Sequence, residues 1–159
     1  MTDLNKILVP TDFSEASVAA LKYACTLAEA LHAELCVLHT VENAYPLGVY
    51  TEYYNPPPDF FQRRDREARE RLDALLTAAE QDRYRARMEL RHGDPAKQIL
   101  QYLYEHGAVH LVVMATHGRG GVARLMMGSV ADKIVRMAPC PVLTVRVPHA
   151  DEPGTTRAA

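Results

Sequence analysis

The chain has 159 residues, of which 48% are hydrophobic and 24% charged, and its formal net charge is −2 at pH 7. This length suits one domain with a substantial core, and the near-neutral charge argues against a protein that binds nucleic acid through a basic surface. No apolar run nears the roughly 18 residues of a membrane helix, no signal peptide is evident and the three cysteines have no metal-binding spacing, so we expect a cytoplasmic protein with reduced thiols, no membrane partner and no protein-held metal.

The N-terminal part of the sequence alternates between strand and helix patterns. KILVPTD (6–12) is a short apolar run that ends at a Pro and an Asp, which predicts a buried first strand. Residues 14–33 repeat apolar side chains every three or four positions, which predicts a helix with one apolar face, capped by Asp12 or Ser14. ELCVLHTVE (34–42) predicts the second strand.

Residues 43–61 interrupt both periodicities. They contain three consecutive prolines, which lack N–H donors, and four tyrosines, which make the segment less polar than a simple linker. We therefore expect an inserted surface loop that is packed by its own side chains. From residue 62 onward, the apolar positions form a helical stripe with a solvated, mixed-charge back. That stripe consists of Ala68, Leu72, Leu75, Leu76 and Ala79.

The C-terminal part continues the alternation. A strand, a helix, a strand, a helix and a strand are predicted over residues 84–93, 94–107, 109–116, 128–138 and 141–147, in that order. The first of these helices starts with Asp94 at the cap and a proline after it, and Gly107 is expected to end it. In the second helix, Ser129 followed three residues later by Asp132 resembles a capping box.

Five apolar strands and four helices predict an α/β fold. The expected architecture is an open, mostly parallel sheet with helices on both faces, formed by one domain over residues 1–148 and followed by a disordered tail at 149–159. Ligands of such sheets bind beyond the carboxyl ends of the strands, where the winding reverses. The candidate loops follow the first and fourth strands and contain PTD and ATHGRGG.

Two interpretations of the glycines near the fourth strand stay open at this point. In one, Gly118, Gly128 and the helix start at Ser129 present backbone N–H groups to a phosphate, and Arg119 adds charge. In the other, Gly118 is a plain turn residue, and Gly128 with Ser129 is an ordinary helix cap. The GxxxxGK[ST] phosphate loop is absent, and spacing alone does not decide between the two.

The sequence resembles the universal stress protein family over about residues 4–147. The resemblance is carried by ILVPTDFSEASVAALKYA, LHTVE, GDPAKQIL and VVMATHGRGGVARLMMGSVADKIVRMAPCPVLTVR. The nucleotide-binding branch of that family has the pattern G-x₂-G-x₉-G-[ST]. Ala115, Gly118, Gly128 and Ser129 stand at these positions, so three of the four match and Ala115 replaces the first glycine.

The resemblance implies a Rossmann-like fold of the adenine nucleotide alpha hydrolase-like kind, with strand order 3-2-1-4-5. It also implies a site for ATP or AMP, with or without Mg²⁺. Asp12 would lie near the ribose or phosphates, backbone groups of Thr40 at the adenine edge, and Gly128 at the terminal phosphates. The implied nucleotide-binding residues are Pro10, Thr11, Asp12, Thr40, Met114, Ala115, Thr116, His117, Gly118, Arg119, Gly128, Ser129 and Val130.

Three functions remain open on the sequence. The first is a stress-response protein regulated by ATP or AMP, in a homodimer paired through the otherwise bare strand at 141–147. The second is a slow ATPase, in which Asp12 would help to hold Mg²⁺; the predicted loops offer no second acidic residue, and no catalytic residue is assigned. The third is a nucleotide-independent interaction protein, which Ala115 supports best.

Overall fold

The computed structural model describes residues 4–42, 59–117 and 127–146 of the chain. The predicted tail at 149–159 and most of the predicted loop at 43–61 lie outside the described residues. The elements follow in the order β1 (Lys6–Thr11), α1 (Glu15–Leu31), β2 (Glu34–Val41), α2 (Phe60–Asp73), α3 (Ala78–Arg83), β3 (Arg87–His92), α4 (Pro95–Glu105), β4 (Leu111–Ala115), α5 (Ser129–Met137) and β5 (Val142–Val145).

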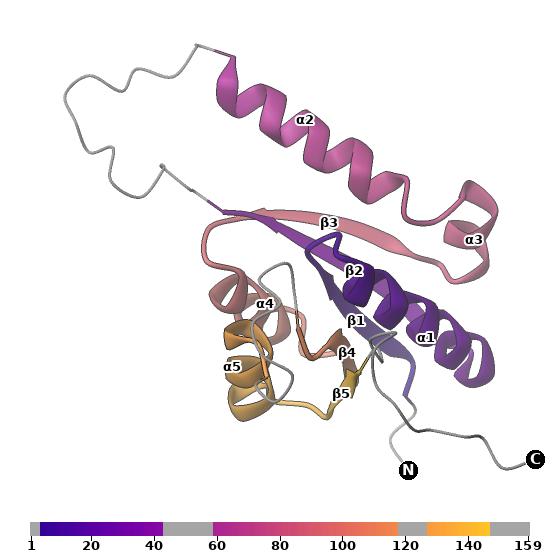
Figure 1. Cartoon of the computed structure of the whole chain (residues 1–159). Coiled ribbons are helices and arrows are strands. Elements are labelled where there is room, and N and C mark those ends of the chain that lie inside the picture. Colours follow the sequence, from indigo (N-terminus) through magenta and orange to yellow (C-terminus); the bar gives the residue numbers. More distant parts are fainter. Residues whose placement is uncertain (1–3, 43–58, 118–126, 147–159) are drawn as a thin grey trace, which may run out of the picture.

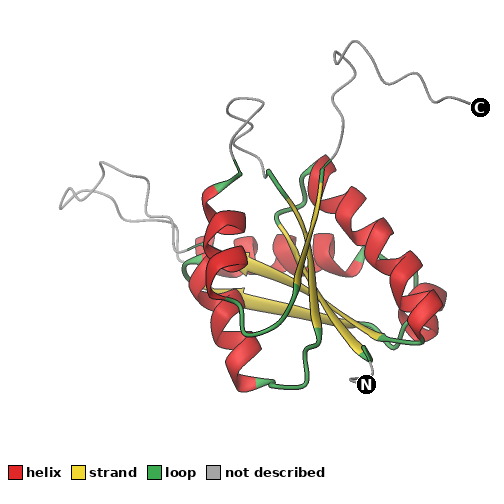
Figure 2. Ribbon diagram, turned by 90° about the horizontal axis from the view of Figure 1, so that it is seen from below, coloured by secondary structure: helices red, strands yellow, loops and turns green. Residues whose placement is uncertain are grey.

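The five strands form one parallel sheet in the order β3-β2-β1-β4-β5. This confirms the predicted α/β class and strand order. Helices cover both faces of the sheet, as Figure 2 shows. Helices α1 and α2 pack on one face, and α4 and α5 pack on the other (Figure 1). The chain winds outward from β1 to β3 and then crosses back to β4, so the winding reverses between β1 and β4.

The central strand β1 is buried on both of its faces. Leu8 packs in the core cluster that includes α4 and α5, whereas Ile7 and Val9 pack in the cluster that includes α1 and α2. All three side chains are fully buried. A strand covered on both sides has a continuous apolar sequence, which explains why the run at 6–12 predicted it correctly. In the described ranges, no helix combines the length and apolarity needed to cross a membrane.

The first helix confirms one of its two predicted caps. Ser14 has an extended backbone, and its side-chain oxygen accepts a hydrogen bond of 3.2 Å from the Ser17 N–H. Asp12 does not cap the helix; its Oδ1 instead accepts bonds from the Ser14 N–H at 3.0 Å and the Ser14 hydroxyl at 2.6 Å. The carboxylate thus braces the turn that leads from β1 into α1.

The helical stripe after residue 62 is divided between two helices and the turn that connects them, so the prediction of four helices was wrong. Helix α2 begins at Phe60, inside the predicted loop, and ends at Asp73; α3 then starts at Ala78. The break is set by a capping box, in which Thr77 Oγ1 accepts from the Glu80 N–H at 3.3 Å and Glu80 Oε2 accepts from the Thr77 N–H at 2.8 Å. This pair satisfies free donors at the start of a new helix.

The predicted capping box at the start of the last helix was also wrong. Gly128 is the N-cap of α5, Ser129 is already the first helical residue, and no side chain caps this helix. Asp132 bonds to Arg136 at 3.0 Å, one turn further along the helix. Both Gly and Ser are favoured N-caps, so the sequence GS left the position ambiguous by one residue.

The other element ends differ from the prediction by a few residues. Strand β3 starts at Arg87, not at 84, because Arg85 has a left-handed backbone with φ 45° that an extended strand does not allow. Helix α4 ends at Glu105 with His106 at its cap, ahead of the predicted stop at Gly107.

Candidate functional site

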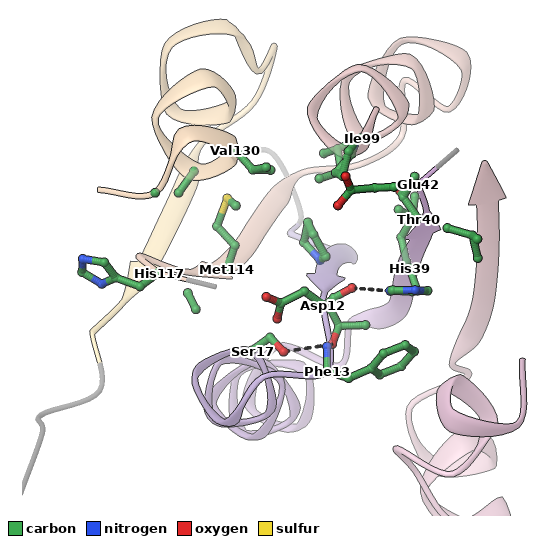
Figure 3. A pocket seen from close by; sticks show the side chains of 18 of the residues that line it. Asp12, Phe13, Ser17, His39, Thr40, Glu42, Ile99, Met114, His117 and Val130 are labelled. Atoms are coloured by element: carbon green, nitrogen blue, oxygen red, sulfur yellow. Dashed lines mark hydrogen bonds between the residues drawn. The ribbon is translucent and has the colours of Figure 1, made fainter. Parts of the chain in front are cut away.

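A cavity of about 910 Å³ opens at the carboxyl ends of β1, β2 and β4. It lies where the winding of the sheet reverses, and Figure 3 shows side chains from several elements turned toward it. Every predicted nucleotide-binding residue that the structure describes lines it: Pro10, Thr11, Asp12, Thr40, Met114, Ala115, Thr116, His117, Gly128, Ser129 and Val130. The remaining two, Gly118 and Arg119, lie outside the described residues.

The turn after β1 forms one wall of the cavity and is held by short polar contacts. The Thr11 and Ser17 hydroxyls lie 3.0 Å apart, and the Phe13 N–H donates to Thr11 Oγ1 at 3.1 Å. Phe13 has a φ of 63°, an uncommon conformation for a bulky residue, which these bonds help to maintain. Figure 3 shows the Asp12 carboxylate facing the cavity.

The start of α5 forms the opposite wall. The Gly128 N–H donates a hydrogen bond of 2.8 Å to the Thr116 carbonyl, so the turn after β4 and the start of α5 are directly joined. The next three amides, at Ser129, Val130 and Ala131, have no acceptor within the described part of the chain. They are the free donors of a helix N-terminus, which also carries a partial positive charge. Their residues line the cavity.

Ala115 stands at the predicted first glycine position. It is the last residue of β4, is paired in register with Val145 and is buried. Its backbone is extended, and it is not among the non-glycine residues with a positive φ. The backbone conformation at this position therefore does not require glycine, so Ala115 would weaken a site only if its methyl group obstructed the ligand.

Two histidines border the cavity. His39 Nδ1 lies 2.8 Å from the Thr11 carbonyl oxygen, and its ring packs against Phe13 at a tilt of 37° with the centroids 4.1 Å apart, so the turn after β1 holds the His39 ring in place. His117 Nδ1 lies 2.8 Å from Thr116 Oγ1. Figure 3 shows the His117 ring directed away from Asp12 and Thr40.

Helix α2 supplies a wall that the sequence did not predict. Arg64, Glu67 and Arg71 line the cavity, although their segment was interpreted as a solvated helix face. Arg71 lies over the Phe13 ring at 4.3 Å from its centroid, on a ring that also contacts His39. Arg64 donates to the Glu42 carbonyl at 2.8 Å. No local motif points from these positions to the cavity, because packing of α2 on the sheet brings them there.

The comparisons with known proteins agree with this fold. The family model described as "Universal stress protein family" matches residues 4–146. The chain belongs to the universal stress protein family. It is 35% identical over 147 residues to the universal stress protein YxiE of Bacillus subtilis, covering 89% of this chain and 99% of that protein. Its fold is similar to that of the universal stress protein UspA from Lactobacillus plantarum, with a TM-score of 0.69, 25% identity, and coverage of 92% and 100%.

Two solved universal stress proteins that share the fold contain nucleotides. One is in complex with cAMP, with a TM-score of 0.64 and 20% identity over 90% of this chain and 97% of that one. The other, from Archaeoglobus fulgidus, is in complex with dAMP, with a TM-score of 0.55 and 19% identity over 91% of this chain and 98% of that one. At these identities the likeness shows the fold alone.

Among the residues that the structure describes, no group of three or more His, Cys, Asp or Glu side chains is placed to hold a metal ion. The acidic residues that line the cavity are Asp12, Glu42 and Glu67. The three cysteines are free thiols. Burial raises the pKa of Cys36 and Cys140 above its ordinary value, and raises that of Cys25 to about 11.

Proposed function

We propose that this universal stress protein binds an adenine nucleotide, ATP or AMP, in the cavity as a regulatory ligand, within a cytoplasmic homodimer that serves the stress response. The observation that carries the proposal is the free N-terminus of α5 joined to the end of β4 at the mouth of the sheet. The stress role and the cytoplasmic location rest on the family alone.

The phosphate end of the site is expected at α5. Amides of a first helical turn bind anions well, since they point along the axis and the helix dipole adds positive potential. The Gly128 amide is already bonded to Thr116, so Gly128 would shape the turn and would not itself donate to a phosphate. The donors would be the amides of Ser129, Val130 and Ala131, helped by the Ser129 hydroxyl.

The base end is expected at Thr40. In β2 the Glu34 N–H points toward β1, donating to Asn5 at 2.8 Å, whereas the Leu35 N–H points toward β3, donating to Tyr84 at 3.1 Å. This alternation directs the Thr40 peptide groups toward β1. The β1 ladder ends at the pair Thr11 and His39.

The Thr40 carbonyl consequently lies past the end of its neighbouring strand. The next amide that would meet it, from Phe13, donates to Thr11 Oγ1 instead. A carbonyl directed beyond the end of a strand is a suitable acceptor for the amino group of a base.

Mg²⁺ would enter this site only with a polyphosphate. Asp12 is the acidic residue nearest to the turn after β1, and its Oδ1 already accepts two bonds from Ser14. One carboxylate together with phosphate oxygens and water is the usual way in which proteins hold Mg²⁺ beside a nucleotide. Turnover of ATP would also need a positioned water, and the described residues present no group assembled for that task, so we favour a binding role over hydrolysis.

The homodimer would form along β5. This strand is at the edge of the sheet, and its four residues are all only half-buried. An exposed edge is a template for pairing with another strand, and a second copy of β5 would cover it.

Isothermal titration with ATP, ADP, AMP and cAMP tests the proposal, using two variants at one position. Ser129→Pro removes the first α5 amide donor, and proline is well tolerated at the first position of a helix. Ser129→Ala keeps that amide and removes only the hydroxyl. We expect the proline variant to bind ATP about tenfold or more weakly than the alanine variant, because hydrogen bonds to charged groups contribute about 1.5–3 kcal/mol. Equal affinities would place the phosphates elsewhere.

A further inference from the structure

Three serine and threonine side chains are buried in the described part of the chain, and all three line the same cavity. They belong to Thr11, Ser17 and Thr40. The Thr11 and Ser17 hydroxyls bond to each other at 3.0 Å. Thr40 Oγ1 is buried with no hydrogen-bond partner. Because buried hydroxyls are nearly always paired, the exception at the cavity wall indicates a missing partner.

The surroundings of Thr40 make its hydroxyl unusual. Side chains alternate along a strand, so Thr40 shares the face of Leu38, which packs in the apolar cluster that includes α4. Ile99 of α4 and Met114 of β4 line the cavity on that side. In the view of Figure 3, Thr40 is drawn on the same side of the cavity as Ile99 and Glu42, which also line it. A polar group in an apolar wall is unfavourable unless something bonds to it.

We propose that Thr40 is a specificity-determining residue, whose side-chain hydroxyl donates a hydrogen bond to one of the two ring nitrogens that flank the amino group of a bound 6-aminopurine. This inference rests on the proposed function, and it adds a side-chain contact to the main-chain carbonyl of the same residue. The carbonyl is a fixed acceptor and the hydroxyl is an adjustable donor, so together they match an amino group beside a ring nitrogen.

A rotation about the Cα–Cβ bond of Thr40 makes the contact. In the described conformation the hydroxyl oxygen has almost no exposed surface, while the residue as a whole is 8% exposed. Threonine occupies staggered rotamers, and a change between them exchanges the hydroxyl with the γ-methyl group. The apolar wall then receives a methyl group, and the hydroxyl gains a partner in the cavity.

The same pairing rejects 6-oxopurines. An oxo group at position 6 would place an acceptor against the Thr40 carbonyl, leaving two acceptors without a proton between them. A site built to hydrogen-bond one group discriminates strongly against an analogue that cannot make the bond. We therefore expect IMP to bind more weakly than AMP.

The test compares three proteins, the native protein and two variants, with three ligands. Thr40→Val removes the hydroxyl at nearly constant shape, and Thr40→Ser retains it as the matched control. Titration with AMP should show affinity about fivefold to tenfold lower for Thr40→Val and little change for Thr40→Ser. The analogues 1-deaza-AMP and 7-deaza-AMP each lack one of the two ring nitrogens. One of the two analogues should bind the native protein with an affinity reduced by a similar factor. The affinity for that analogue should not change in Thr40→Val.

A second measurement separates this role from a structural one. Since the hydroxyl is unpartnered in the ligand-free protein, Thr40→Val should have a melting temperature at least as high as that of the native protein. The proposal would be overturned if Thr40→Val melted at a lower temperature than the native protein. It would also be overturned if Thr40→Val lowered the affinity for all three ligands by the same factor. If the native protein bound AMP and Thr40→Val bound it equally well, only this inference would fail. No binding of any nucleotide by the native protein would overturn the proposed function as well.

Discussion

The amide of Gly128 donates a hydrogen bond of 2.8 Å to the carbonyl oxygen of Thr116. The bond joins the turn after β4 to the start of α5. Thr116 is held in turn by its own amide, which donates to the Val145 carbonyl at 3.1 Å. These two bonds within the chain fix the start of α5 to the sheet, so the free amides of its first turn are already in place, which would lower the entropic cost of the proposed anion binding.

A serine at position 128 tests whether those amides serve binding or stability. Gly128 is the N-cap of α5 and offers no side chain to it. Gly128→Ser would place a hydroxyl where it accepts from a first-turn amide, and we expect slightly greater stability, by a few tenths of a kcal/mol, in urea denaturation. The same bond would occupy an amide that we propose for phosphate binding, so ATP affinity should fall severalfold. An increase in both stability and ATP affinity would contradict the assignment of these amides to phosphate binding.

Much of the fold follows from local patterns in the sequence. The apolar run at β1 and the Asp94 cap of α4, which accepts from the Lys97 N–H at 2.8 Å, are visible as short signals and are confirmed. The described residues of the loops after the first and fourth strands also proved to line one cavity, because the topology of a parallel sheet brings its carboxyl ends together. The capping box of Thr77 and Glu80 carries an equally local signal, which the longer apolar stripe obscured.

The rest of the site depends on tertiary packing. Arg64 and Arg71 reach the cavity because Leu72, on the same helix, is buried against the sheet. Nothing in the local pattern of α2 distinguishes a charged residue at the cavity from one in open solvent. The free hydroxyl of Thr40 likewise becomes apparent only when its neighbours are known.

Restoring glycine at position 115 should destabilise the protein and do little for binding. Ala115 lies in an extended strand without a positive φ, so glycine relieves no strain there. Glycine inside a strand costs about 0.5–1 kcal/mol through its greater freedom in the unfolded chain. We therefore expect Ala115→Gly to reduce the free energy of unfolding by about that amount, while ATP affinity in titration changes by less than about threefold. A large gain in affinity would show that the methyl group obstructs the ligand.

Cys25 should be slow to react with alkylating reagents. Burial, together with the nearby Glu80 carboxylate, raises its pKa from 9.0 to about 11. The reactive form is the thiolate, so at pH 8 the folded protein should hold about 100-fold less of it at this position than an ordinary cysteine. Mass spectrometry of iodoacetamide-treated protein should show modification of Cys25 rising between pH 9 and 11 and accelerating on unfolding in urea.

The same shift has a defined effect on stability. The folded state favours the neutral thiol of Cys25, so its contribution is present below the unfolded pKa near 9 and is lost as the pH rises toward 11. Cys25→Ser should remove this part of the alkaline decline in urea unfolding, because a serine hydroxyl does not titrate in that range. If the alkaline decline in stability stayed unchanged in Cys25→Ser, the titration of other groups would have to cause it.

A proline on β5 tests the proposed dimer without disturbing the sheet. The Pro141 carbonyl, just before β5, accepts from the Val112 amide, and the Val145 carbonyl accepts from the Thr116 amide just after β4. The peptide groups of odd-numbered residues in β5 therefore face the sheet. By alternation, the peptide groups of Thr144 face the open edge. Thr144→Pro removes one donor from that edge, where proline is tolerated. Light scattering should then show a dimer for the native protein and for the control Thr144→Val, and a monomer with unchanged circular dichroism for Thr144→Pro. A native monomer, or a dimer that survived the proline, would move the interface away from β5.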